Sequence, residues 1–393
     1  MLFIDEINIM DAISSLEEST EKKFNIPVFN VSHWDSSLAF QNKMAQVLSL
    51  PQVALPWNYC YSYSISDQVR QQVLTNLGLP SKQFPETMAL LIQSSTIAII
   101  NIVNLLVHYQ KKKLCILQPS YFSVAACCSA FSLNFGTEEI KFRNGRPQLP
   151  TDEILAGGYD CVWITSPVYC TGRYFDAALT EEILRLKDRG LMIVTDESLA
   201  LPGEELLRTI PVDPNILAIY SPHKAISING LKFAVIACSK YYEEFLDQWL
   251  DVLAGSLSGS NRDAVFHYIS PNYLTGCVPT YKAYIKERKR DIQQVIENFS
   301  FASMLPDTHG HYINIFTDLQ FRTPKKLLGL LQEMICESMV SFFPGTLNGF
   351  SPAQGLNFRV NLTGDPVALP GAVGKILAYL EKYYHIHSET VID

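Results

Sequence analysis

The sequence has little concentrated positive charge, and this argues against several functions at the outset. Among its 393 residues, 31 are Lys or Arg and 39 are Asp or Glu, so the net charge is −8. Its two basic runs, residues 111–113 and 286–290, are short and typical of solvated helix ends. Nucleic-acid-binding proteins carry a basic patch or stripe, so we expect no nucleic-acid partner.

Disulfide and metal-binding patterns are also missing. The nine cysteines are odd in number, form no Cys-x-x-Cys pair, and lie in several cases inside apolar runs. This usage is typical of reduced thiols inside the cell, so we expect a cytoplasmic protein. The histidine pairs at residues 309 and 311 and at residues 385 and 387 have no supporting ligand pattern, and we expect no metal.

Membrane signals are absent as well. Residues 1–6 have neither a basic start nor a clean apolar core, so they do not predict a signal peptide. The longest apolar stretch, residues 88–109, is interrupted by polar residues such as Gln93 and Asn101. It predicts a buried helix with a polar start rather than a membrane span, and we expect no membrane partner.

The composition is that of a well-packed globular protein, with 48% apolar and 18% charged residues. A chain of this length predicts one large domain and one smaller domain. We place the large domain at residues 46–285, and the small domain at residues 1–45 and 286–393.

Short apolar runs alternate with helical patterns in the large domain. The predicted strands cover residues 114–117, 161–164, 191–194 and 216–220, and an apolar run at 233–238 follows them. The predicted helices cover residues 66–77, 94–110, 122–132, 180–189 and 241–253, and a further charged helix at residues 281–298 leads into the smaller domain. Continuous apolar strands separated by helices predict an α/β fold, with a mostly parallel sheet between two helical layers.

The last part of the chain predicts a smaller α+β domain. Its predicted strands cover residues 312–316, 339–343 and 357–362. Its predicted helices cover residues 324–338 and 371–384.

Polar residues follow the ends of the strands in the large domain: Tyr121, Tyr169, Asp196, Ser221 and Lys224. In such sheets ligands bind beyond the carboxyl ends of the strands, so these residues predict a site. A lysine at the end of a core strand is costly to bury unless it is neutralised, for example as a Schiff base with an aldehyde cofactor. A lysine in a surface loop is the alternative.

One cofactor needs all of these groups. Pyridoxal phosphate requires a lysine for covalent attachment, a carboxylate beside its ring nitrogen, a flat side chain on its ring and an anion site for its phosphate. Lys224, Asp196 and Tyr121 match the first three requirements. The helix start formed by Ser94, Ser95 and Thr96 fits either simple N-capping or the anion site.

Two further features, which do not lie at the predicted strand ends of the large domain, also have two interpretations each. Arg359 lies in an apolar strand and needs an anionic partner, which is either an internal carboxylate or a ligand. Residues 33–37 form either a turn or a loop that faces the substrate, with Trp34 and Asp35 as candidate substrate-binding residues.

From about residue 61 to residue 363, the sequence resembles the fold-type-I pyridoxal-phosphate enzymes, and class I/II aminotransferases in particular. Ser221, Lys224 and Gly230-Leu231-Lys232 match the lysine motif of that family. Residues 119–121 match the motif of the stacking aromatic residue, and residues 196–197 match the acid that pairs with the ring nitrogen. Residues 343–345 and 357–360 match the tail motif.

The resemblance implies a role for each residue. Ser221 and Lys232 would bind the cofactor phosphate together with the helix start at residues 94–96. Tyr121 would stack on the ring, and Asp196 would pair with the ring nitrogen. Arg359 would hold the α-carboxylate of the substrate. The resemblance also implies a homodimer, in which Tyr61 or Tyr63 reaches the phosphate of the partner subunit.

The sequence departs from the family pattern at two positions. Tyr169 replaces the asparagine that usually bonds the phenolic oxygen of the cofactor, and Leu199 replaces a tyrosine that supplies a second donor. We hypothesise that Tyr169 alone supplies this hydrogen bond, which indicates a divergent member of the family.

The sequence therefore predicts a cytoplasmic, homodimeric pyridoxal-phosphate aminotransferase that acts on an α-amino acid through a Lys224 Schiff base. Elimination, decarboxylation, cyclisation or oxidation of an amino acid would use most of the same residues. A non-catalytic binding module of the same fold is a further alternative.

Overall fold

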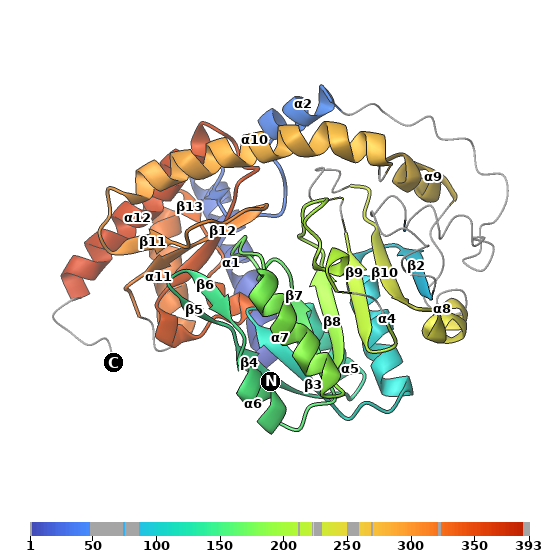
Figure 1. The fold of residues 1–393 in the computed structure, drawn as a ribbon. Helices are drawn as coiled ribbons and strands as arrows, with labels where there is room; N and C mark the ends of the chain where they lie inside the picture. Colours follow the sequence, from blue (N-terminus) through green and yellow to red (C-terminus); the bar gives the residue numbers. More distant parts are fainter. Residues whose placement is uncertain are drawn as a thin grey trace. The chain divides into compact units, whose positions relative to one another are not determined.

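The computed structural model describes residues 2–47, 74, 86–210, 213–221, 223, 230–249, 259–268, 270–320 and 324–387. The chain divides into two compact units (Figure 1). Unit 1 comprises Met1–Asn42, Cys170–Gly172 and Ala283–Asp393, and unit 2 comprises Lys43–Tyr169 and Arg173–Lys282. The predicted boundaries lie at residues 45 and 286, and the assignment of residues 170–172 to unit 1 was not predicted.

Unit 2 is built around a seven-stranded sheet with the strand order β2-β10-β9-β8-β7-β3-β4. These strands are β2 (Thr87–Ile92), β3 (Lys113–Gln118), β4 (Asn134–Glu139), β7 (Cys161–Thr165), β8 (Met192–Glu197), β9 (Ile216–Tyr220) and β10 (Ala234–Ser239). β10 runs antiparallel to both of its neighbours, whereas the other pairs are parallel. This topology confirms the predicted mostly parallel sheet.

Helices cover both faces of this sheet (Figure 1). On one face, Trp163, Val194 and Ile219 pack in one core with the apolar side of α4 (Ser95–His108) and with α5 (Ser123–Ala130). On the other face, residues such as Ile164 and Ile193 pack with α6 (Thr151–Ala156) and α7 (Ala177–Asp188). Because side chains alternate along a strand, neighbouring residues of one strand serve opposite cores.

The remaining elements of unit 2 are short. They are the hairpin of β5 (Lys141–Arg143) and β6 (Arg146–Gln148), the 3₁₀ turns η2 (Leu206–Arg208) and η3 (Lys240–Tyr242), and the helices α8 (Glu243–Trp249) and α9 (Gly259–Tyr268). Apart from Leu74, the helix predicted at residues 66–77 lies outside the described residues.

The apolar stretch at residues 88–109 is not one helix, so that prediction was wrong. Its first part forms β2, which is buried along its whole length and pairs with β10. A short apolar run that is buried on both faces has the same composition whether it is a strand or a helix, so periodicity does not separate the two. The helix begins only at Ser95, after the Ser94 hydroxyl accepts a hydrogen bond from the Ile97 N–H.

Unit 1 combines two small sheets with long helices. Its elements are α1 (Leu2–Phe24), β1 (Phe29–Asn30), β11 (Ala302–Met304), β12 (Tyr312–Thr317), α11 (Pro324–Ser338), β13 (Val340–Ser341), η5 (Gly345–Asn348), η6 (Pro352–Gln354), β14 (Asn357–Asn361) and α12 (Ala368–His387). β11, β12 and β14 form an antiparallel sheet, and β1 pairs with β13 in parallel. α1 packs against α11, which also contacts α12.

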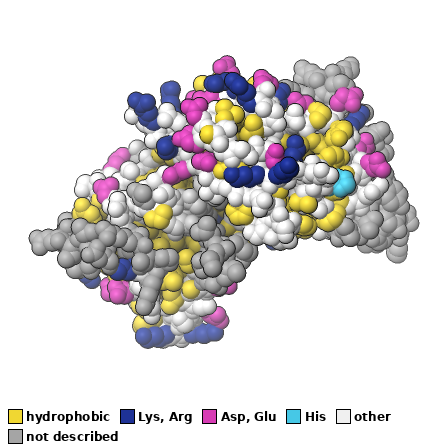
Figure 2. Space-filling model, turned by 90° about the horizontal axis from the view of Figure 1, so that it is seen from below, with side chains coloured by type: hydrophobic (Ala, Val, Ile, Leu, Met, Phe, Trp, Pro, Cys, Tyr) yellow, Lys and Arg dark blue, Asp and Glu magenta, His cyan; other side chains and the backbone are white. Residues whose placement is uncertain are grey.

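Two helices contain a boundary between the units: α2 (Leu38–Ala45) and α10 (Pro271–Ile296). α10 begins ten residues before its predicted start, and Pro279 lies inside it. No helix among the described residues is long and apolar enough to cross a membrane. On the face shown in Figure 2, Lys and Arg side chains are interspersed with Asp and Glu side chains.

Candidate active site

The predicted site residues that the structure describes in unit 2 lie at one edge of the sheet. Asp196 pairs in register with Thr165 of β7 on one side and with Ile219 of β9 on the other. Ser221 follows β9 two residues beyond Ile219. β2 also ends at this edge. Its last residue, Ile92, pairs with Ala234 at the start of β10, and the last residue of β9, Tyr220, pairs with the next residue, Val235. The sheet register therefore brings Asp196, Ser221 and the start of α4 to the same edge.

Asp196 lies on the α4 face of the sheet, since Met192 and Val194 of the same strand belong to the core on that face. The residue is 3% exposed. Its Oδ1 accepts hydrogen bonds from the N–H of Ser198 at 3.1 Å and from the hydroxyl of Ser198 at 2.6 Å. A carboxylate that is buried at a sheet edge and oriented by two donors can bind a cationic ring nitrogen.

Two aromatic rings lie near this edge. Tyr121 follows β3 and packs, half-buried, against the core on the α4 face. Tyr169 is buried, and its ring centroid lies 5.9 Å from that of Tyr121 with an interplanar angle of 42°. The structure thus brings the predicted stacking residue next to the residue that replaces the family asparagine.

The start of α4 has both features that the sequence left as alternatives. Ser94 is its N-cap, and its hydroxyl accepts a hydrogen bond from the Ile97 N–H at 3.2 Å, so the capping interpretation is confirmed. Ser95 is half-buried and Thr96 is exposed in the first turn. An N-cap satisfies only part of the free N–H groups of a helix start, so capping and anion binding are compatible.

Ser221 and His223 lie just beyond the end of β9. The Ser221 hydroxyl is buried and donates to the Phe233 carbonyl at 3.1 Å. His223 is also buried, and its Nδ1 lies 2.9 Å from the same carbonyl. Lys232 is exposed. Lys224 lies outside the described residues, as do Tyr61 and Tyr63.

Two buried hydroxyls at this edge have no hydrogen-bond partner in the described protein. They are the Oγ of Ser120, beyond β3, and the Oγ1 of Thr165, at the end of β7 beside Asp196. Buried hydroxyls in native proteins are nearly always bonded, to the protein, to ordered water or to a bound molecule. The edge thus fits a polar ligand such as pyridoxal phosphate, with an acid, an aromatic ring and hydroxyls on one face.

Arg359 belongs to unit 1, where it lies in β14 and is 3% exposed. Its Cζ lies 4.3 Å from the ring centroid of Trp34, 5.2 Å from that of Tyr312 and 5.5 Å from that of Phe343. Three aromatic rings around a guanidinium favour its charge, because their faces carry negative potential.

Hydrogen bonds also hold this arginine in place. Its Nε donates to the Ser32 carbonyl at 3.0 Å, and its Nη1 lies 3.9 Å from the Cys170 sulfur. The Ser32 hydroxyl donates to the Arg359 carbonyl at 2.6 Å. Ser32, which precedes the large domain in the sequence, and Arg359, which follows it, are thus held together by hydrogen bonds.

Hydrogen bonds from another residue of unit 1 hold the segment at residues 33–37 in place. The side-chain amide of Asn361 donates to the carbonyls of His33 and Asp35, at 2.9 and 3.0 Å. The Asp35 side chain is exposed, whereas Trp34 is half-buried against Arg359. The substrate-binding roles of Trp34 and Asp35 stay predictions.

Glu197, the residue after Asp196, lies on the opposite face of the sheet. It is 1% exposed, and its Oε1 accepts hydrogen bonds from the Thr195 hydroxyl at 3.0 Å and the Leu207 N–H at 3.1 Å. Burial and the neighbouring Glu205 carboxylate raise the pKa of Glu197 to about 8. Burial also raises the pKa of Tyr220, which lies near both acids, well above its ordinary value.

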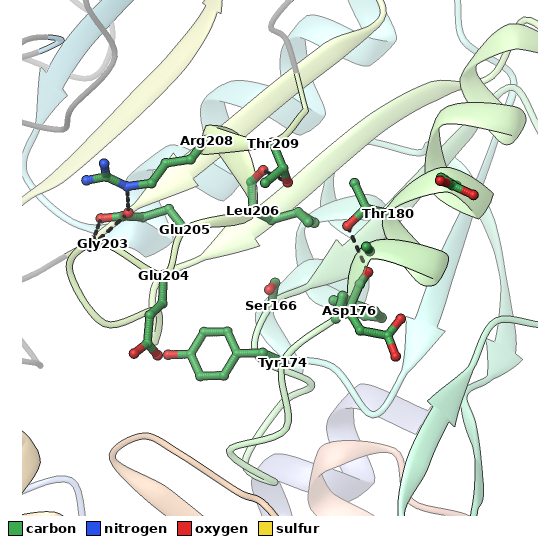
Figure 3. Close-up of a pocket in the computed structure, with 13 residues that line it drawn as sticks. Ser166, Tyr174, Asp176, Thr180, Gly203, Glu204, Glu205, Leu206, Arg208 and Thr209 are labelled. Carbon is green, nitrogen blue, oxygen red and sulfur yellow. Dashed lines mark hydrogen bonds and ion pairs between the residues drawn. The ribbon is translucent and has the colours of Figure 1, made fainter.

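A cavity of about 510 Å³ opens on this second face, between α7 and the segment that contains η2 (Figure 3). Glu205 accepts hydrogen bonds from the Gly203 N–H and forms an ion pair with Arg208. The ring of Tyr174 points toward Glu204, as Figure 3 shows, and its hydroxyl accepts from the Leu201 N–H at 2.9 Å. None of the predicted cofactor residues within the described ranges lines this cavity, so we assign it no role in the site.

Three residues at the site edge were not predicted from the sequence. Thr165 was missed because a threonine at a strand end has no distinctive pattern. His223 lies within the lysine motif, but its bond to Phe233 depends on the return of the chain through β10. The signal available for Ser198 was the Asp-x-Ser spacing, which is typical of a side-chain-capped turn.

Comparison with known proteins shows the fold. No protein-family model matches the sequence, and no curated protein matches it. A probable N-succinyldiaminopimelate aminotransferase from Thermus thermophilus has 17% identity and a TM-score of 0.73, and the match covers 94% of this chain and 100% of that chain. The multiple substrate aminotransferase from Thermococcus profundus has 11% identity and a TM-score of 0.72, with 91% and 92% coverage.

The kynurenine aminotransferase from Pyrococcus horikoshii, solved in complex with PMP, has 12% identity and a TM-score of 0.72, with 91% of both chains covered. At these identities the likeness shows the fold. The chain has the fold of these aminotransferases, which confirms the predicted fold class.

Proposed function

We propose that the protein is a pyridoxal-phosphate-dependent aminotransferase that acts on an α-amino acid. The observation that carries the proposal is the convergence of Asp196, Ser221, Tyr121 and the start of α4 at one edge of an aminotransferase-fold sheet. The sequence motifs point to each of these groups independently of its position in the fold. The complex of the Pyrococcus horikoshii neighbour with PMP supports the choice of cofactor.

The residues at this edge are of the types that the cofactor requires. Asp196 would bind the ring nitrogen, and the Tyr121 ring would cover one face of the cofactor ring. The phosphate would be held by the start of α4, the Ser221 hydroxyl and Lys232. Tyr169 would donate a hydrogen bond to the phenolic oxygen.

When bound, pyridoxal phosphate supplies an aldehyde and an electron-withdrawing ring. The amine of Lys224 would hold that aldehyde and, once released, would accept the α-proton of the substrate at Nζ. Asp196 would keep the ring nitrogen protonated. Arg359, held by Ser32 and the three aromatic rings, would orient the α-carboxylate of the amino acid.

We also propose that the active protein is a homodimer, since the phosphate site of this class of enzyme is completed by a tyrosine of the partner subunit. Tyr61 and Tyr63 are the candidates in this chain. Size-exclusion chromatography with light scattering gives the mass directly. A mass near 44.2 kDa, that of one chain, in the active preparation would rule the dimer out.

The central experiment is the absorption spectrum of the purified protein with pyridoxal phosphate, followed by titration with a panel of amino acids. We expect a visible band that an amino donor bleaches, with transfer of the amino group to an added α-keto acid. Lys224→Ala should lose the covalent band. Lys240→Ala, which removes an exposed lysine at the far end of β10, should keep it.

The possible outcomes separate the parts of the proposal. A wild-type protein with no visible band would overturn the choice of cofactor. A band that persists in Lys224→Ala without added amine would overturn the role of that lysine. Release of ammonia or carbon dioxide, without amino-group transfer, would replace transamination by elimination or decarboxylation.

A further inference from the structure

The carboxylate of Asp196 has an unusual neighbour within its own turn. Ser198 is 7% exposed, and both its N–H and its hydroxyl donate to the same oxygen, Oδ1, of Asp196. The hydroxyl bond, at 2.6 Å, has the length of an O–H donor bonded to an ionised acceptor. Two donors on one oxygen fix the plane of the carboxylate and stabilise its charged form.

The main chain around this pair is held independently of the hydroxyl. The Ser166 N–H donates to the Asp196 carbonyl at 3.0 Å, and the Ala200 N–H donates to the Glu197 carbonyl at 3.0 Å. The Ser198 N–H bond to Asp196 needs no side chain. Loss of the Ser198 hydroxyl should therefore leave the turn intact and remove only its bond to the carboxylate.

Burial alone would act against the charge on Asp196. A carboxylate with 3% exposure loses most of its hydration, which favours the protonated acid. A charge-assisted bond from the Ser198 hydroxyl offsets this loss. A neutral acid at this position would have to release its proton before it could pair with a protonated ring nitrogen.

We infer that Ser198 is a positioning residue that orients the Asp196 carboxylate and keeps it ionised for the ring nitrogen of the cofactor. This inference rests on the proposed function. Ser198 acts through Asp196 and has no direct role in the reaction. Because of Ser198, the Asp196 carboxylate is already charged and already oriented when the cofactor binds.

The probe for this inference is pyridoxamine 5′-phosphate, which has no aldehyde and therefore binds without forming a bond to Lys224. Its dissociation constant is measured by calorimetry between pH 5 and pH 8 for the wild type and for Ser198→Ala. The ratio of the two constants cancels the titration of the ligand. It also cancels the titration of the other groups near this edge, Tyr121, Tyr169 and His223, which both proteins share.

We expect this ratio to be smallest at pH 8, where Asp196 is charged in both proteins and only its orientation is lost. It should be about tenfold larger at pH 5, because a pKa that is higher by about one unit in the variant changes the charged fraction by up to tenfold. The ratio should stay flat for an analogue in which carbon replaces the ring nitrogen, since that ring has no proton to share with Asp196. Ser198→Thr keeps the hydroxyl and should behave as the wild type. Ser129→Ala, which removes an exposed serine on α5, is the matched control.

Ser198→Cys provides a second variant if Ser198→Ala does not fold, because a thiol of similar size is a much weaker donor. An equal loss of affinity at all pH values, or the same pH dependence for the carbon analogue, would show a purely structural serine and overturn the inference. A wild-type protein that does not bind pyridoxamine 5′-phosphate at pH 8 would instead overturn the proposed function.

Discussion

Replacing Glu197 with Gln should make the stability of the protein much less dependent on pH. Glu197 is buried, and burial together with Glu205 raises its pKa from 4.5 to about 8. Between these values the folded protein holds a proton that the unfolded chain releases. The free energy of unfolding of the wild type should therefore fall as the pH rises from 4.5 to 8 and should level off above that range.

The size of the change in the free energy of unfolding follows from the shift in the pKa of Glu197. A shift of about 3.5 pH units, at about 1.4 kcal/mol each, corresponds to about 5 kcal/mol, which is an upper limit. Glutamine is neutral at every pH, so its burial does not become less favourable as the pH rises. Its carbonyl oxygen can still accept hydrogen bonds from Thr195 and Leu207. At pH 4.5 the two proteins should differ by less than about 1 kcal/mol, and at pH 8 the variant should be more stable by several kcal/mol.

The assay is urea unfolding at constant ionic strength, followed by tryptophan fluorescence at pH values from 4.5 to 9. The matched control is Glu181→Gln, which removes an exposed carboxylate from the lining of the same cavity and should give a curve parallel to the wild type. Glu205→Gln should reduce the pH dependence in part, since it removes only the second cause of the shift. Parallel curves for Glu197→Gln and the wild type would refute the reasoning.

Three further predictions concern other sites. Arg359→Lys should raise the KM for amino acids by at least about tenfold in steady-state kinetics, because lysine cannot form the paired bonds of a guanidinium with a carboxylate; an unchanged KM would contradict this role. Gly345→Ala should abolish stable folding in thermal scans, because the added Cβ would overlap the buried side-chain amide of Asn357. The control is Gly371→Ala in α12, where the added Cβ meets no neighbour and should stabilise the protein by about 0.5–1 kcal/mol. Cys336→Ser should remove one fast equivalent from a thiol titration, because the other seven cysteines in the described ranges are buried; an unchanged fast phase would disprove it.

The sequence predicted five of the seven strands of the sheet in unit 2, but not β2 or β4, and it predicted polar residues at the ends of these strands, because both depend on strong local signals. A parallel strand that is buried on both faces is a continuous apolar run, and a polar residue at its end is easy to see, as with β8 and Asp196. Where a strand resembles a buried helix, as β2 does, the same signal fails. Its identity as a strand depends on pairing with β10, about 140 residues later.

The parts that the sequence did not reveal depend on contacts between distant segments. α1 has mixed apolar and polar residues, and its partner α11 begins about 300 residues later. The three residues Cys170–Gly172 belong to unit 1 because the Gly172 carbonyl accepts from the His309 N–H at 2.6 Å. The Ser198 bond was missed for a different reason, since it depends on the geometry of a single turn.

The contact between α1 and α11 also has a consequence for synthesis. Ribosomes add about 5–20 residues per second, so about 15–60 seconds pass between the emergence of α1 and that of α11. During that time α1, whose Ile13 is fully buried in the folded protein, lacks the helix against which it packs. The nascent chain thus exposes the apolar residues of α1 long before α11 can cover them, and exposure of this kind is a general reason why chaperones act on nascent chains.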